Sequence, residues 1–313
     1  MDNLKYFLKR LLQTIPILLG VCLIIFLLFH IVSGDPTHLI LGKNATKQQM
    51  AELREQLGLN RHWFIQYLDV VKSAFTFDFG SSWATKQNIA NMVKEGITPS
   101  LTLTLPAFII STIFSLMLGV LVAYYRGGKV DRYVRVICIC GMSIPSLSYI
   151  LFFQWSLAYK LGWFDISGYD FGFPNFIPYI ILPGIIWIIL SIGPDVRFFR
   201  TVILDELYQD YVRTARAKGL NEVTVLFKHV LKNTLIPIIT YVVIQLPYLI
   251  LGALLLESFF SIPGLGGLIL SALNNNDFPV LKAMAILSSI AIIIFSLITD
   301  FLYTLADPRV KLK

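Results

Sequence analysis

The chain has 313 residues, is 56% hydrophobic and only 14% charged, and carries a net charge of +7. A water-soluble domain of this length would be about one-quarter charged, and its apolar residues would come in short periodic groups. The composition therefore argues against an ordinary soluble domain and indicates an integral membrane protein.

Six apolar segments are candidates for crossing a membrane. A helix needs about 18 or more largely uncharged residues to cross a hydrocarbon core of about 30 Å, because each residue advances it by about 1.5 Å. The last segment is shorter, but it extends past Asp300. We predict an all-α polytopic membrane protein with six transmembrane helices, in residues 11–29, 101–125, 136–159, 176–193, 234–256 and 283–299.

The first apolar segment follows basic residues, as a secretory signal does. It is too long for a signal, however, and no small-residue cleavage site follows it, so we predict a retained span. The three cysteines, Cys22, Cys138 and Cys140, all fall within predicted spans. Cysteine there behaves as a small apolar residue, which argues against a disulfide framework.

The basic residues predict the orientation, because they stay on the cytoplasmic side when they lie in short loops. They concentrate before the first span, between the second and third, between the fourth and fifth, and after the last. The short loops on the other side hold only Lys160 and Lys282. Both termini and residues 195–234 are therefore predicted to be cytoplasmic. Topology and anionic lipid explain the net charge without nucleic acid.

This topology divides the chain into three parts. Residues 1–32 are the N-terminal segment and first transmembrane helix, 33–100 an extracytoplasmic cap, and 101–313 a five-helix core with a cytoplasmic loop at 195–234. The cap is predicted to hold two helices, at 45–57 before Gly58 and at 61–75. Aromatic residues on the second helix fit packing or an interfacial belt better than a ligand site.

The cytoplasmic loop is predicted to contain two short helices. Asp205 and Glu206 would open the first, and Gly219 would stop it. Asn221 would cap the second, and Pro237 would begin the next span. Such helices would form a rigid projection at the membrane face. The same periodicity is compatible with a solvated basic loop lying on lipid.

The predicted spans offer few groups for chemistry. The ionisable residues His30, Glu257 and Asp300 lie near span ends rather than at depth. The sequence shows no convincing Ser/His/Asp order, HExxH pair or nucleotide-binding glycine loop. The segment PGLGG at 263–267 lacks the lysine of such a loop and is predicted to be a tight turn. If the protein uses ATP, another chain must hydrolyse it.

Several motifs in combination carry a family resemblance. The most specific are DYVRTARAKGL at 210–220 with HVLKNTLIPII at 229–239, and ESFFSIPGLGGL at 257–268. Shorter motifs spread this pattern over almost the whole chain, namely SGDP at 33–36, FDFGSSW at 77–83, NDFPVL at 276–281 and DPRVK at 307–311. With these motifs the chain resembles the permease subunits of ABC importers of the dipeptide, oligopeptide and nickel class, especially the first of the two permeases.

The resemblance implies the ABC type I importer permease fold, in the bacterial cytoplasmic (inner) membrane, with a coupling helix that seats on an ATPase subunit. In that superfamily the coupling loop carries the pattern E-A-A-x-x-x-G. Arg213, Thr214 and Ala215 stand at its first three positions here, and Gly219 at its last. Because the Glu is missing, its salt bridge cannot be carried over.

Basic residues are predicted to meet acidic groups on the ATPase instead, while Ala215 and Gly219 keep the helix slim enough to dock. The residues assigned to ATPase coupling are Tyr211, Arg213, Thr214, Ala215, Arg216, Lys218 and Gly219.

Polar residues in or beside the spans are the pore and gate candidates. Gln154, Gln245, Ser143 and Ser146 could contact cargo, although interhelical hydrogen bonds would explain them equally well. Glu257, with Pro263 and Gly264, is assigned to an outer gate loop. Pro145, Pro183 and Pro247 permit kinks, which ordinary packing also explains.

The resemblance implies a transport subunit, not an enzyme, that forms half of a pathway for di- or oligopeptides. Its partners would be a homologous second permease, two ABC ATPase subunits that hold ATP and Mg, and an extracytoplasmic peptide-binding protein. The chain itself would bind no cofactor or metal.

Three alternatives stay open. An importer of nickel or another chelate would share the architecture, although the absence of His or Cys clusters favours peptide. A proton-driven secondary transporter would work without an ATPase. A membrane scaffold or enzyme would need a reactive set of residues that we do not find.

Overall fold

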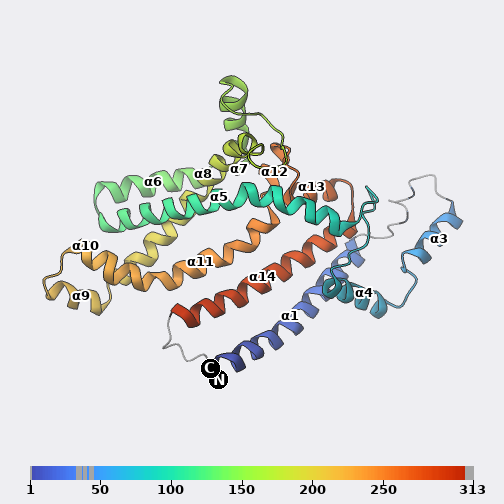
Figure 1. The fold of residues 1–313 in the computed structure, drawn as a ribbon, viewed down its shortest axis with the longest axis horizontal. Helices are drawn as coiled ribbons and strands as arrows, with labels where there is room; N and C mark the ends of the chain where they lie inside the picture. Colours follow the sequence, from blue (N-terminus) through green and yellow to red (C-terminus); the bar gives the residue numbers. More distant parts are fainter. Residues whose placement is uncertain (1, 33–36, 38–40, 42–45, 307–313) are drawn as a thin grey trace.

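The computed structural model describes residues 2–32, 37, 41 and 46–306, and these residues are mostly helical (Figure 1). The motifs predicted at 33–36 and 307–311 lie outside the described residues, as do the basic residues of the C-terminal tail used for the orientation.

Among the described residues, five helical segments are long and apolar enough to cross a membrane. They are Leu12–Ile31 within α1 (Asp2–Val32), α5 (Ile89–Tyr124), α8 (Ile177–Leu207), Glu222–Phe259, and Phe278–Asp300 within α14 (Phe278–Ala306). A bent pair, Lys129–Ser143 with Ser146–Lys160, makes a sixth candidate. The all-helical polytopic prediction is confirmed, and the count is six if the bent pair is one span.

The third predicted span is broken rather than straight. α6 (Lys129–Ser143) ends before Ile144, whose backbone is extended at φ −88° and ψ 127°. The residue before a proline is pushed out of the helical region, so Pro145 forces this break. α7 (Ser146–Phe153) then continues into the π-helix η1 (Gln154–Lys160), and the two halves meet at 90°.

The fourth span is longer than predicted, and this corrects the start of the coupling helix. α8 continues to Leu207, so Asp205 and Glu206 end this helix instead of opening the next one. The buried residues Phe199, Ile203 and Leu207 explain the continuation, because their spacing keeps one helix face in the core.

The fifth span is also longer than predicted. α10 (Glu222–Thr224), η2 (Val225–Val230) and α11 (Leu231–Leu251) follow one another without a break. Pro237 therefore lies inside α11 and does not begin it. The second short helix of the predicted pair is in fact the start of a long one.

The predicted cap contains both expected helices. α3 (Lys47–Gln56) is preceded by Thr46, which forms a capping box with Gln49, and α4 (Trp63–Thr76) follows. The hydroxyl of Tyr67 donates to the Leu19 carbonyl of α1 at 3.1 Å, so this aromatic side chain packs within the chain. α5 begins at Ile89, inside the segment predicted as cap, because the Asn88 side chain caps it.

Long helices packed side by side form the body of the molecule. α5 packs along α8, α11 along α14, and α14 along α1 (Figure 1). Glycines allow close approach: a Cβ on Gly119 would lie 2.8 Å from the Phe199 Cβ, and one on Gly193 would lie 2.7 Å from Met142 Cγ. Small residues at helix contacts are typical of membrane bundles.

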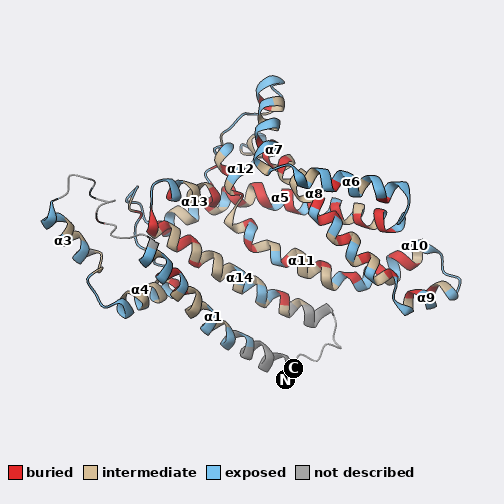
Figure 2. Cartoon of the chain, turned by 180° about the vertical axis from the view of Figure 1, so that it is seen from behind, coloured by how far each residue is buried: buried red, intermediate tan, exposed pale blue. Residues whose placement is uncertain are grey.

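Many residues on the outer faces of these helices are exposed (Figure 2). Large apolar residues are among them. Met117 of α5 is 66% exposed and Ile137 of α6 is 68% exposed. A soluble monomer rarely exposes so much apolar surface, whereas lipid or another membrane subunit would cover it. Of the three free cysteines, Cys22 and Cys138 are buried as expected, but Cys140 is exposed.

We expect Gly119→Leu to destabilise the bundle, because the new side chain would meet the backbone of α8 as well as Phe199. Its Cβ would lie 3.3 Å from the Arg200 backbone nitrogen, and a backbone atom cannot rotate away. Overpacking costs about 1–3 kcal/mol, which a lower thermal unfolding midpoint in detergent would report. Gly20→Leu in α1 is the matched control, since its Cβ would meet nothing within 4 Å. Equal losses in both variants would contradict the close-packing argument.

Candidate functional site

The predicted coupling residues lie on a compact turn, which we call the α9 elbow (residues 208–224). α9 (Asp210–Ala217) ends at Gly219, whose φ of +80° is a conformation that glycine adopts without steric cost. The side chain of Asn221 then accepts a hydrogen bond from the Thr224 amide at 2.7 Å. The predicted helix stop and cap are confirmed.

The inner face of α9 packs against the chain's own core. Val212 and Ala215 are buried against residues from α8, α5 and η2, namely Ala123, Ile203, Leu207, Val225, Leu226 and Val230. The small side chain of Ala215 thus lets α9 lie close to its own helices, rather than keeping the helix slim for a partner. This packing joins the elbow to the ends of α8 and the α10–α11 helix.

Two polar contacts fasten the elbow internally. The Tyr211 hydroxyl donates to Glu206 Oε2 at 2.5 Å. Burial and this contact raise the pKa of Tyr211 to about 12, so the phenol keeps its proton at physiological pH. Across Gly219, Arg216 donates to both carboxylate oxygens of Glu222, at 2.8 and 3.1 Å. Tyr211 and Arg216, predicted to face a partner, are thus engaged within the chain.

The outer face of the elbow carries the remaining predicted residues. Arg213, Thr214, Lys218 and Gly219 are exposed. The Arg213 side chain is 73% exposed, and its ion pair with Asp210 is long, at 3.6 Å. Exposed Leu220 and Val223 lie on the same turn. The elbow therefore offers a small surface that is both basic and apolar.

The opposite end of the bundle holds the second predicted group of residues, which we call the Glu257 loop (residues 252–267). It contains α12 (Leu254–Phe259) and leads into α13 (Leu265–Asn274). Glu257 is completely buried. Its Oε1 accepts from Ser100 Oγ at 2.8 Å and from the Ala253 amide at 3.0 Å, and its Oε2 accepts from the Gly267 amide at 3.0 Å. One carboxylate thus joins α5, α12 and α13.

The glycines of this loop are needed because its backbone lies so close to Glu257. A Cβ on Gly252 or Gly264 would overlap the Glu257 carboxylate. Ser100 completes the cluster by accepting from the Leu265 amide at 2.8 Å. The motif at 257–268 therefore encodes a buried carboxylate surrounded by backbone. These contacts are those of a tie that holds the loop, and its role as a gate stays a prediction.

A cavity of about 620 Å³ lies beside the Glu257 loop. Pro263 and Gly264 line it, together with Glu95 of α5, Phe171 and Asn274. The predicted gate residues therefore border an open space at this end of the bundle.

The predicted pore residues do not form one site. Gln154 donates to the carbonyls of Ile166 at 2.9 Å and Phe259 at 3.1 Å, so it fastens η1 to α12. Ser143 donates to the Ile139 carbonyl within α6. Gln245 and Ser146 are half-buried on α11 and α7. For Gln154, hydrogen bonding within the chain is a sufficient explanation.

Three carboxylates that are buried in the described part of the chain were not predicted as functional from the sequence. Asp131 pairs with Arg200, Asp195 accepts from the Tyr241 hydroxyl at 2.6 Å, and Asp277 accepts from Ser82 and from the Trp83 amide. Asp131 was detectable as one acid among four nearby basic residues, Arg126, Lys129, Arg132 and Arg135. Nowhere in the described ranges do three or more His, Cys, Asp or Glu residues gather as metal ligands would.

Comparison with known proteins covers nearly the whole chain. The family described as binding-protein-dependent transport system inner membrane component matches residues 115–312, and its N-terminal counterpart matches residues 3–104. The glutathione transport system permease protein GsiC is 33% identical over 310 residues in Salmonella typhimurium and in Escherichia coli K12, covering 99% of this chain and 100% of the relative. A probable peptide ABC transporter permease protein, y4tP of Sinorhizobium fredii, is 33% identical over 311 residues, with 98% and 99% covered.

We expect Glu257→Gln to loosen the Glu257 loop, because an amide nitrogen would replace one of the two accepting oxygens. Either the Ala253 or the Gly267 amide would then lose its acceptor, which costs about 1–3 kcal/mol in a buried site. Amide hydrogen exchange in residues 252–267 should become faster. Glu95→Gln, an exposed residue that lines the same cavity, is the control. Unchanged exchange in the Glu257 variant would show that the tie is not needed.

Proposed function

Because this chain belongs to the family of binding-protein-dependent transport system inner membrane components, we propose that it forms half of the membrane pathway of an ATP-driven importer of di- or oligopeptides. Family membership makes it a multi-pass inner-membrane permease subunit of an ABC transporter, which is a transport component and not an enzyme. Systems of this kind combine permeases with an ATPase and a binding protein.

The cargo proposal is supported by the relatives. The two named above are called permeases for glutathione and for peptide, respectively. Glutathione is itself a short peptide, so a short peptide is the cargo that both names share. Import of nickel or another chelate is the second candidate for the same architecture.

The α9 elbow is the observation that carries the coupling part of the proposal. A coupling element must be stiff and must be joined to membrane helices. α9 meets both needs, since Val212 and Ala215 pack on α8 and η2, and Arg216 is locked to Glu222. The exposed face with Arg213 and Lys218 would meet acidic and apolar residues of the ATPase.

We place the elbow on the cytoplasmic side, with both termini. Support comes from the basic loops and from α1 and α14, which are joined by an ion pair of 3.2 Å between Arg10 and Asp300. The start of the first span and the end of the last span therefore lie at the same side of the bundle, as an even number of membrane crossings requires. ATP and Mg would bind to two ATPase subunits, and a homologous second permease would cover part of the exposed apolar surface.

ATPase closure would move the elbow and, through it, α8 and α11. A rigid-body shift of these helices would change the side of the membrane to which the pathway opens. The Glu257 loop, at the opposite end, would then act at the outer mouth.

The complex isolated from membranes tests this proposal. ATP turnover should rise when the binding protein and a di- or oligopeptide are added together, and a chelate should have no effect. The permease alone in vesicles should transport nothing. Uptake by the permease alone, or uptake that an uncoupler abolishes while ATP is maintained, would instead support a proton-driven transporter.

We expect Gly219→Leu to uncouple the importer without blocking membrane insertion. A leucine at φ +80° would carry a left-handed backbone cost of about 1–2 kcal/mol and would distort the elbow. Peptide-stimulated ATP turnover should fall about tenfold, the factor that corresponds to ~1.4 kcal/mol. Gly162→Leu is matched, with φ +63° and open space around its Cβ, and lies at the end of η1, away from the elbow. Similar losses in both variants would contradict a specific role for the elbow.

A further inference from the structure

We propose that Asp131 is a coupling joint, a positioning residue that makes α6 move together with α8 when the α9 elbow is displaced. The inference rests on the proposed function, in which the elbow receives the motion of the ATPase. It assigns a role to a carboxylate that lies outside both the elbow and the Glu257 loop.

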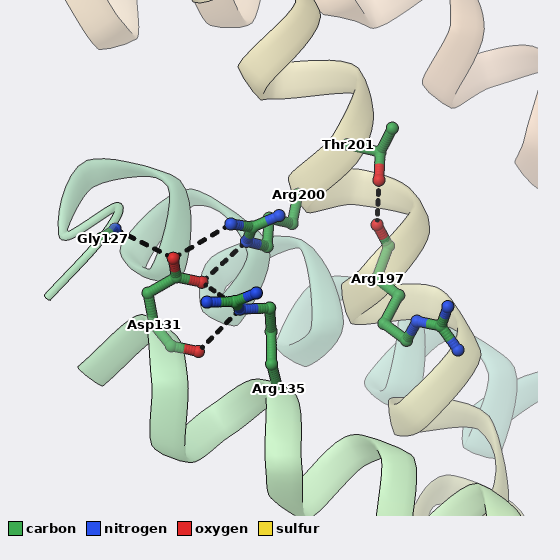
Figure 3. Close-up of polar contacts among 6 residues, drawn as sticks. All are labelled: Gly127, Asp131, Arg135, Arg197, Arg200 and Thr201. Carbon is green, nitrogen blue, oxygen red and sulfur yellow. Dashed lines mark hydrogen bonds and ion pairs between the residues drawn. The ribbon is translucent and has the colours of Figure 1, made fainter. Parts of the chain in front are cut away.

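Asp131 gathers donors from three segments (Figure 3). Arg200 of α8 donates from Nε to Oδ1 at 2.8 Å and from Nη2 to Oδ2 at 3.0 Å. The Gly127 amide, in the turn between α5 and α6, donates to Oδ2 at 2.9 Å. Arg135, one turn along α6, is paired with Oδ1 at 2.9 Å. A single side chain therefore links the α5–α6 turn, α6 and α8.

The geometry of this joint fixes the orientation of Arg200 relative to Asp131 as well as their separation. The guanidinium of Arg200 binds both carboxylate oxygens, and such two-bond pairing restricts rotation in addition to separation. Asp131 is only 1% exposed, so water cannot replace a lost partner easily. The ion pair of Arg61 with Asp69 is different, because both side chains are more than half exposed and joined by one contact of 3.5 Å. Pairs of that kind contribute little.

α8 connects the joint directly to the elbow. Ile203 and Leu207, both buried, follow Arg200 within about two turns of the same uninterrupted helix. They pack on Val212 and Ala215 of α9. A displacement of α9 therefore reaches Arg200 through a short, continuous helical segment, without crossing a loop.

The other side of the joint leads toward the Glu257 loop. α6 runs from Asp131 to the break at Pro145, and α7 and η1 continue from there. In η1, Gln154 donates to the Phe259 carbonyl, two residues from Glu257. The bent helix pair is thus fastened near both of its ends, at Asp131 and at Gln154. A joint at Asp131 would let it carry motion from the elbow to the outer loop, alongside α11.

A purely structural role predicts something different from a coupling role. If Asp131 only stabilised the fold, its loss would reduce the amount of assembled importer but leave the peptide moved per ATP unchanged. If it is a joint, ATP hydrolysis would continue while the peptide moved per ATP falls. The stoichiometry of the assembled complex separates the two roles.

The test uses the whole importer, reconstituted with its ATPase, second permease and binding protein. For Asp131→Asn we expect the peptide transported per ATP to fall about tenfold, with ATP turnover within about twofold of wild type. Arg200→Gln should give the same loss, and the double variant no more than either single one, because both remove one joint. The matched control, Asp69→Asn with Arg61→Gln, should keep the wild-type stoichiometry.

Arg200→Lys keeps the proposal testable if Asp131→Asn fails to assemble. A lysine retains the charge but not the two-bond geometry, so the stoichiometry should fall by an intermediate amount, about threefold. An assembled Asp131→Asn or Arg200→Lys importer with wild-type stoichiometry would overturn the proposal.

A distance measurement gives a readout that does not depend on the cargo. Spin labels at Ile137→Cys in α6 and Thr201→Cys in α8, both exposed positions, would be placed in a chain whose own three cysteines are replaced by alanine. In the wild-type joint, the label distance should be the same with and without trapped ATP, whereas Arg200→Lys should let it change. An ATP-dependent change in the intact joint would also overturn the proposal. Absence of peptide uptake by wild type would count against the proposed cargo alone, since the distance still reports on the joint.

Discussion

The structure depends on one constraint: inside a bilayer, each polar group must find its partner within the protein. In the long helices, the backbone N–H and C=O groups find their hydrogen-bond partners within the same helix. Buried carboxylates are harder to accommodate. Asp131 has donors in Arg200 and the Gly127 amide, Glu257 has donors in Ser100 and two amides, and Asp195 accepts from the Tyr241 hydroxyl. Polar side chains in this chain therefore act mainly as fasteners between elements.

Several of these fasteners lie toward the two ends of the bundle, whereas the hydrogen bond between Asp195 of α8 and Tyr241 of α11 lies between them. Asp131 and the Arg216–Glu222 pair hold elements at the α9 end, while Glu257 and Asp277 hold loops at the α13 end. Elsewhere α5 and α8 touch through small residues, as where Gly184 of α8 lies beside Ala107 of α5. Directional bonds resist displacement more than apolar contacts do. Helices that are fastened at a few points and otherwise touch through apolar contacts suit a protein in which helices shift as rigid bodies.

Local signals made much of this fold predictable. Uncharged segments predicted the spans, and Gly219 and Asn221 marked a turn and a cap whose chemistry lies within a few residues. The extent of α8 was not predictable in that way, because Asp195 and Arg200 suggest a loop when they are read alone. Their partners, Tyr241 and Asp131, are distant in sequence. Only the folded chain shows that Asp195 is hydrogen-bonded and that Arg200 is paired with a carboxylate within a continuous helix.

The α9 elbow also shows that a sequence motif does not reveal which of its residues face a partner. Resemblance identified the stretch, but only packing shows which residues face outward. Val212 and Ala215 point inward, and Arg216 is held by Glu222 six residues later, so the surface left for a partner is centred on Arg213 and Lys218. This surface includes fewer residues than the motif predicted. An elbow stiffened by its own ion pair needs fewer bonds to a partner, because the partner then has only to push on it and not to shape it.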